Sequence, residues 1–443
     1  MSWKTTAKSF GIFLVVGALL LILFQWTYVR NVFPAIKSTE SIQNLDVRRK
    51  VKTSRDVRVS QRKLLQELKL VLVQRKNTTA SMESWKKKKK QICGVKWQDK
   101  YKKLHQDILE SRVPPRYLVF NCGGVGYGCG GYGNRINGIT SLLYLAVLTK
   151  RALLIDWKSN ISITEYFSPK NIKWDFSQAK LRGLKSRHHF WGKGFHKNVP
   201  IETVRPGYTF DEVIKWLLKT DLEHYFDHEV EYISTQWYFA PAIRRSKYLG
   251  KTARDVTTKR RGHRYSLIGC AFDFLFQQTP MFKKLLSKTR KSLNWKSGIP
   301  RIGIHFRAGD VPAFRTNKKS KTPIYSALEQ FFQCAKKLER LFKKIDPSLD
   351  TSSIEWFLAT DTKEVKYYGE KKYPNKVTYL DIKIEHISMS DPSRLGIEGV
   401  LLDNALLAEC DILIMSDSSF SRAALGMAFH SLIVNAFGDN CKY

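Results

Sequence analysis

The C-terminal third of the chain alternates short apolar runs with longer segments of helical periodicity, and no other feature constrains the fold as strongly. Such alternation predicts a parallel β-sheet covered by helices on both faces. A similar unit lies earlier, where the run YLVFNC leads into a glycine-rich loop, a helix-like segment and the run RALLIDW. The C-terminal runs lie at 302–306, 354–359, 377–382, 411–415 and 432–437.

We therefore predict an α/β protein with an N-terminal domain at 116–265 and a C-terminal domain at 266–443. The chain has 443 residues, 43% of them hydrophobic, which suffices for two buried cores. Residues 30–115 are rich in Lys and Arg, which is typical of a basic stem. Within this stem, VSQRKLLQELKLVLVQRK predicts an amphipathic helix; the alternative is a self-associating helix that joins two copies into a homodimer.

Residues 1–29 combine a short tail with an uncharged apolar segment from Phe10 to Tyr28. At about 1.5 Å per residue this segment nearly spans a hydrocarbon core of about 30 Å. No small-residue cleavage site follows it, so we expect an uncleaved transmembrane signal anchor; a cleaved signal peptide is the alternative.

The chain is strongly basic, with 76 Lys and Arg against 39 Asp and Glu and a formal net charge of +37. Such a surplus favours a polyanionic partner. If the anchor places the body of the protein in a lumen, we expect no nucleic-acid partner. The remaining polyanionic partners are acidic glycans, anionic lipid and nucleotide-bearing substrates. The seven cysteines include no CxxC pair suited to zinc. Cys122 and Cys129 flank the glycine-rich loop and form either a disulfide or two buried thiols.

Ligands of open α/β sheets bind beyond the carboxyl ends of the strands, so the residues that follow the apolar runs are candidate site residues. Glycines within 130–133 allow close approach of a ligand, and the helix start behind them favours negative charge. Arg307 offers a fork of donors suited to phosphate, and His305 lies on the same strand face. Asp361 offers an acceptor, and the serines within 416–421 offer hydroxyls at another helix start. A diphosphate-linked nucleotide requires this combination.

Four motifs, in order along the chain, resemble those of the fucosyltransferase superfamily, which groups α1,6-, α1,2- and protein O-fucosyltransferases. They are GCGGYGNRINGI, HFRAGD, FLATD and GVLLDNALLAECDILIMSDSSFSRAALGMAF, and the last is most similar to the α1,6 branch. The resemblance covers about residues 117–155 and 266–437. It implies a GT-B fold of two Rossmann-like domains, with domain 116–265 on the acceptor side and domain 266–443 binding a GDP-fucose donor. It also implies inversion at the sugar carbon and no required metal or other cofactor.

By this resemblance, Arg307 holds the donor diphosphate and offsets the charge of the departing GDP, and Asp310 is the candidate catalytic base. Asp361 lies on the guanosine side. The chain departs from the pattern at Ala308, where a second arginine is usual, and at Val311, where a lysine is usual. The other donor-binding residues implied are Gly131, Gly133, Asn134, Arg135, His305, Ser418, Ser419, Phe420 and Ser421.

These features together predict an inverting fucosyltransferase in the Golgi membrane, of single-pass type II topology with a lumenal catalytic domain. It moves L-fucose from GDP-fucose to a hydroxyl of a glycan or glycoprotein acceptor, α1,6- or α1,2-linked and, given the basic charge, of acidic character. The alternatives are a protein O-fucosyltransferase and an inactive relative that binds anionic glycans at the membrane. His224 and His228 are spaced for one helix face, as in zinc sites, but without a third ligand in view we favour a structural role.

Overall fold

The structure is a computed structural model of the chain. The expected membrane segment at 10–28 lies outside the residues that it describes, and no described helix is long and apolar enough to cross a membrane. The described residues are 64–73, 87, 89–123, 129–158, 161–192, 203–256, 265–295, 298–310, 322–385, 387, 392–429, 433–435 and 441.

The N-terminal half contains a four-stranded parallel sheet with the strand order β2-β1-β5-β4. It forms from the two predicted runs and from two further strands. The strands are β1 (Tyr117–Gly123), β2 (Ala152–Lys158), β4 (Ser186–Trp191) and β5 (Val230–Thr235), and the helices around them are α4 (Lys96–Leu109), α5 (Tyr132–Leu148), α6 (Phe210–Lys219), α7 (Leu222–Tyr225), α8 (Ala240–Ile243) and α9 (Gly250–Val256).

The C-terminal half contains a five-stranded sheet, also parallel, with the order β11-β10-β7-β8-β9. Its strands coincide with the five predicted apolar runs, so the predicted mixed α/β fold with parallel sheets is confirmed. The strands are β7 (Arg301–Phe306), β8 (Glu355–Thr360), β9 (Val377–Thr378), β10 (Ile412–Met415) and β11 (Ile433–Asn435), and the helices are α10 (Ser266–Leu275), α11 (Pro280–Ser292), α13 (Thr322–Ile345), α14 (Lys363–Lys372), α15 (Arg394–Glu409) and α16 (Ser419–Ala428).

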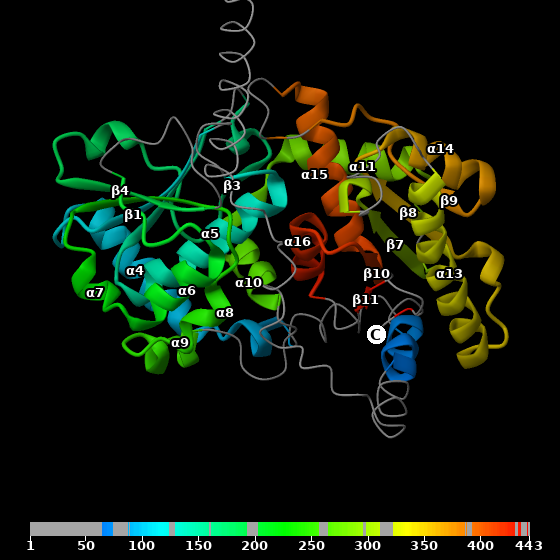
Figure 1. The fold of residues 1–443 in the computed structure, drawn as a ribbon, viewed down its shortest axis with the longest axis horizontal. Helices are drawn as coiled ribbons and strands as arrows, with labels where there is room; N and C mark the ends of the chain where they lie inside the picture. The colour runs from blue at the N-terminus through cyan, green and yellow to red at the C-terminus, as the bar shows by residue number, and fades with distance from the viewer. Residues whose placement is uncertain are drawn as a thin grey trace, which may run out of the picture. The chain divides into compact units, whose positions relative to one another are not determined.

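Three helices, α5, α10 and α16, lie between the two sheets (Figure 1). Helix α5 is buried on nearly all sides, which explains why its sequence is apolar well beyond one stripe. One hydrophobic cluster runs through these helices and takes in side chains of both sheets. A short antiparallel pair, β3 (Phe167–Pro169) with β6 (Phe276–Gln278), adds a further link between the halves.

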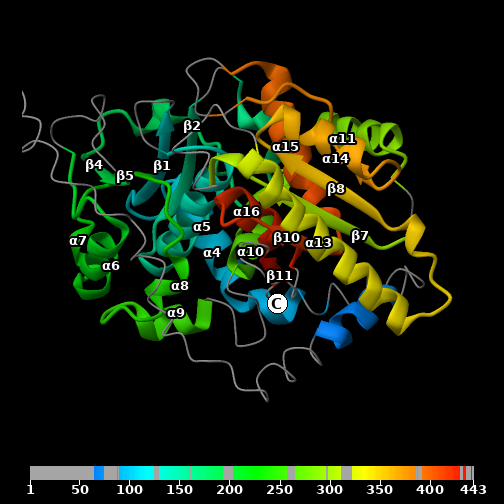
Figure 2. The same ribbon diagram turned by 45° about the vertical axis from the view of Figure 1, so that its right-hand side comes forward.

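Parts of the predicted stem are folded onto the body. Residues 64–73 form a helix whose Leu64, Leu68 and Leu72 are at most 6% exposed, in a cluster with side chains of α13, β7 and β10 (Figure 2). Helix α4 likewise packs on the first sheet, where its Ile108 clusters with Val119 of β1 and Leu154 of β2. The leucine face proposed for self-association is therefore covered within the chain, and that mode of dimerisation is not supported.

Three disulfides join described residues: Cys93 with Cys270, Cys122 with Cys129, and Cys334 with Cys441. Of the two alternatives for Cys122 and Cys129, the structure has the disulfide. Cys410 stays a buried thiol. The first disulfide attaches the segment before α4 to α10, and the last attaches α13 to the C-terminal end of the chain.

Candidate functional site

A cavity of about 200 Å³ opens where the carboxyl ends of both sheets face each other. The loop after β1 borders it on one side, and the segments after β7, β8, β9 and β10 border it on the other. Of the predicted site residues, Gly131, Gly133, Asn134, His305, Arg307, Asp361, Ser418, Ser419 and Phe420 line it.

Two helix N-termini meet at this cavity. Gly133 in the first turn of α5 lies against the backbone of α16, so closely that a Cβ there would be 2.4 Å from the carbonyl carbon of Ser419. Ser418 caps α16 by accepting a hydrogen bond from the N–H of Phe420, and no side chain caps α5. The partial positive charges of both helix starts therefore point to one place.

Arg307 follows β7. Among the described residues of the glycine loop, the β7 motif and the serine motif, it is the one charged side chain that lines the cavity. Its side chain is 42% exposed, and its Nε lies 3.7 Å from the Asp361 carboxylate. Its backbone N–H donates to the Ser416 hydroxyl, and the next N–H, of Ala308, donates to Asp361 at 2.9 Å. Ser416 and Asp361 thus fix the turn that presents the guanidinium.

Ala308 is only 1% exposed and packs in the hydrophobic cluster beneath the sheet. The position that departs from the fucosyltransferase pattern therefore points into the core rather than toward the cavity. Beyond it, Asp310 ends the short 3-10 turn Ala308–Asp310, and its side chain lies outside the described part of the structure.

Arg135 and Ser421, both predicted to contact the donor, do not line the cavity. Arg135 is 1% exposed; its guanidinium lies over the Trp157 ring and donates to the carbonyl of Gly130, so it supports the glycine loop from below. Burial lowers the pKa of Arg135 to about 10. Ser421 is fully buried behind His305 and bonds to its ring.

Sequence reasoning missed four charged groups in the cavity wall: Asp403 on α15, Lys366 on α14, and Lys383 and Glu385 in the segment after β9. Burial raises the pKa of the Asp403 carboxyl to about 7, and the Lys366 ammonium opposes this shift. Asp403 Oδ1 is buried and has no hydrogen-bond partner among the described residues. Lys366 is 3% exposed and donates to the carbonyl of Leu380 at 2.5 Å. A lone carboxylate in the apolar stretch GVLLDNALL was the available signal.

The segment after β9 and helix α15 also bring aliphatic side chains into the cavity wall. Gly399 of α15 faces Ile382, so closely that a Cβ at Gly399 would lie 3.0 Å from that side chain. The apolar side chains lining this part are Ile382, Ile384, Ile387 and Val400. A flat aromatic group would find dispersion contacts here together with the Asp403 carboxylate as an acceptor.

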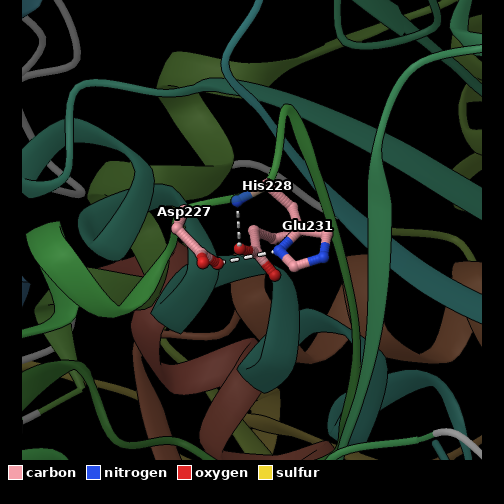
Figure 3. A group of neighbouring side chains, drawn as sticks. All are labelled: Asp227, His228 and Glu231. Atoms are coloured by element: carbon pink, nitrogen blue, oxygen red, sulfur yellow. Dashed lines mark hydrogen bonds and ion pairs between the residues drawn. The ribbon is translucent and has the colours of Figure 1, made fainter.

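His224 and His228 do not share a helix face, because α7 ends at Tyr225. His228 instead lies with Asp227 and Glu231 at the amino end of β5, the opposite edge of the sheet from the cavity (Figure 3). Although these three have ligand atoms close enough for a metal, Glu231 already binds the Arg187 guanidinium at 2.8 Å and the His189 ring at 2.6 Å. A cation there would compete with Arg187, so the group is better described as an internal charge network.

No family model and no curated protein matches the chain. Among solved structures, it is similar to a mutant of the Arabidopsis thaliana fucosyltransferase FUT1 in complex with GDP, with a TM-score of 0.50, 14% identity and 76% of this chain and 77% of that one covered. It also matches the α-1,6-fucosyltransferase NodZ from Bradyrhizobium, with a TM-score of 0.44, 16% identity, and 70% and 92% coverage. The chain therefore shares the fold of the FUT1 structure.

Proposed function

We propose that the protein is a GDP-fucose-dependent glycosyltransferase of GT-B type that transfers fucose to a glycan hydroxyl. The observation that carries the proposal is the meeting of the α5 and α16 N-termini with Arg307 in one cavity. Free N–H groups, helix dipoles and a guanidinium form a site for two adjacent phosphates. The FUT1 structure that shares the fold is a GDP complex, which supports this reading.

The apolar part of the cavity suits the base of the donor. Guanine presents two neighbouring N–H donors, at N1 and N2, and a carboxylate presents two acceptor oxygens. Asp403, with its unpartnered Oδ1, matches that edge. Because the bound base would favour the ionised carboxylate, donor binding lowers the pKa of Asp403 from its raised value.

The proposed reaction is a direct displacement with inversion. The acceptor hydroxyl oxygen forms a bond to the anomeric carbon while the bond from that carbon to the phosphate oxygen breaks. The acceptor proton passes to a base, for which Asp310 remains the candidate, and the electron pair leaves with GDP. Arg307 and the helix N–H groups stabilise the charge that develops on the leaving diphosphate. The glycine loop, Arg307 and the serine motif can bind a diphosphate without a metal ion. Fucose transfer without a metal stays a prediction.

We further propose that the protein works in an oxidising lumen such as that of the Golgi, anchored as a type II membrane protein. The three disulfides support an oxidising compartment. The basic surplus supports an acidic acceptor glycan. The linkage, α1,6 or α1,2, is a matter for the acceptor screen below.

Thermal unfolding of the full chain with GDP, GDP-fucose and UDP tests the donor. A ligand at about 100 times its dissociation constant adds about 2.7 kcal/mol of stability. We expect GDP and GDP-fucose to raise Tm, UDP to have little effect, and Arg307→Ala to abolish the increase. The control is Arg112→Ala, which removes another exposed arginine that pairs with a carboxylate but does not line the cavity.

Release of GDP from GDP-fucose in the presence of glycan panels then tests transfer. Removing Arg307 should lower kcat/KM about 100-fold, the equivalent of about 3 kcal/mol of transition-state stabilisation. Stabilisation by GDP with no transfer to glycans or to folded protein modules would favour the inactive relative, for which Ala308 is the sequence hint. No stabilisation by any nucleotide would refute the donor site.

A further inference from the structure

The His305 ring is held in one position at the floor of the cavity. The residue is 5% exposed, the last but one of β7, and the Phe420 ring lies 5.0 Å from the imidazole. Its Nδ1 lies 2.5 Å from the Ser421 hydroxyl. Its Nε2 has no partner among the described residues, and His305 is part of the cavity lining. Burial, and then the nearby Arg307 charge, lower the pKa of His305 to about 3, so the ring is neutral.

The Ser421 hydroxyl lies within hydrogen-bond distance of two groups. One is His305 Nδ1, which donates or accepts depending on the tautomer, and the other is the carbonyl oxygen of Ser416, at 3.2 Å, which can only accept. When the hydroxyl gives its one proton to Ser416, it can only accept from His305, and Nδ1 then carries the ring proton. A neutral imidazole with a proton on Nδ1 has a bare lone pair on Nε2.

We propose that Ser421 is a positioning residue that holds His305 in its Nδ1–H tautomer, so that Nε2 accepts a hydrogen bond from an O–H or N–H group of the nucleotide sugar. The proposal rests on the proposed donor site and assigns Ser421 a role other than phosphate binding. A lone pair would repel a phosphate oxygen, so His305 contacts a hydroxyl or N–H group of the donor. The donor phosphates bind Arg307 and the N-terminal N–H groups of α5 and α16, as proposed above.

The tautomer itself can be observed. In long-range ¹H–¹⁵N correlation spectra of the full chain labelled with [¹⁵N]histidine, His305 is identified among the ten histidines by the signal that His305→Gln removes. We expect the Nδ1–H pattern in the wild type and a shift toward the Nε2–H pattern in Ser421→Ala. An unchanged pattern in Ser421→Ala, or an Nε2–H pattern in the wild type, would overturn the proposal.

Binding measurements distinguish the proposed role of Ser421, positioning His305, from a direct contact with the phosphates. Ser421→Ala should weaken GDP-fucose or GDP binding about tenfold, as expected for about 1.4 kcal/mol, and leave inorganic diphosphate binding unchanged. If the affinities for the nucleotide and for diphosphate fall equally, Ser421 contacts the phosphates. If neither affinity changes, Ser421 has only a packing role and the proposal fails. The matched control is Ser266→Ala, which removes a buried hydroxyl of α10 that has no partner among the described residues.

Failure of the proposed function gives a different result. If the wild type binds neither GDP nor GDP-fucose, the donor assignment fails while the spectra still report the tautomer. If the wild type binds both and only the spectra disagree, the donor site stands and the role of Ser421 fails.

Discussion

Replacing Gly133 by alanine tests the contact on which the proposed phosphate site depends. The new Cβ would lie 2.4 Å from the carbonyl carbon of Ser419 and 2.5 Å from the N of Phe420, whereas ordinary contacts begin near 3.4 Å. Since these are backbone atoms, the starts of α5 and α16 must separate by about 1 Å. Overpacking of this kind costs about 1–3 kcal/mol, and alanine recovers about 0.5–1 kcal/mol of helix preference.

The two effects leave a net loss of up to about 2.5 kcal/mol, which should lower Tm by up to roughly 10 °C in a thermal scan. Binding should suffer more than stability, because the separation moves the N–H groups of both helices away from the phosphates. We expect the dissociation constant of GDP to rise at least about tenfold in calorimetry. The control is Gly369→Ala on α14, whose Cβ would meet only the ends of side chains at 3.1–3.3 Å. If Gly133→Ala matches the wild type in both Tm and GDP affinity, the helix starts do not form the phosphate site.

Three further predictions concern pH, the disulfides and the N-terminal helix. The pKa of Asp403 is raised from 3.8 to about 7 in the folded state, so the folded protein holds this proton to higher pH than the unfolded chain does, and stability should fall as pH rises from about 4 to 7. Asp403→Asn should remove that fall in denaturant titrations across this range and should weaken GDP binding; an identical pH profile would count against the raised pKa. Replacing Cys93 and Cys270 together by serine should lower the free energy of unfolding by about 2–5 kcal/mol, and more than the same change at Cys122 and Cys129, since the loops span 177 and 7 residues. Leu68→Ala should cost about 2–5 kcal/mol because Leu68 is fully buried, while Leu70→Ala, at a residue that is 51% exposed, should cost little; equal effects would mean that helix 64–73 does not pack on the body in solution.

The strands of the C-terminal sheet were predictable because each is a compact apolar run between helical segments. The same holds for β1 and β2. In contrast, β4 and β5 escaped prediction because they carry charged residues within the strand. The structure explains these charges, since Arg187 and His189 of β4 bond to Glu231 of β5, and Glu231 is fully buried. Such pairing across strands leaves no periodic signal in either segment.

The candidate site was predictable where it lies directly after a strand. The glycine loop, Arg307, Asp361 and the serines before α16 all border the cavity. Asp403 and Lys366 come from the middle of helices, and only the packing of α14 and α15 brings them there. Ser421 shows the opposite error, because its motif suggested a ligand contact while the helix turn directs its hydroxyl inward to His305.

Helix 64–73 also has a consequence for biosynthesis. The ribosome makes its three buried leucines early, but they pack on α13, β7 and β10, which are made much later. Until then, these leucines remain without their final partners, and nascent chains with exposed apolar segments are prone to aggregate or to bind chaperones. The disulfide between Cys334 and Cys441 likewise forms only when the end of the chain has been translated. The C-terminal half should therefore reach its native state only after Cys441 has been made, and its assembly, rather than that of the first sheet, should limit the yield of folded protein.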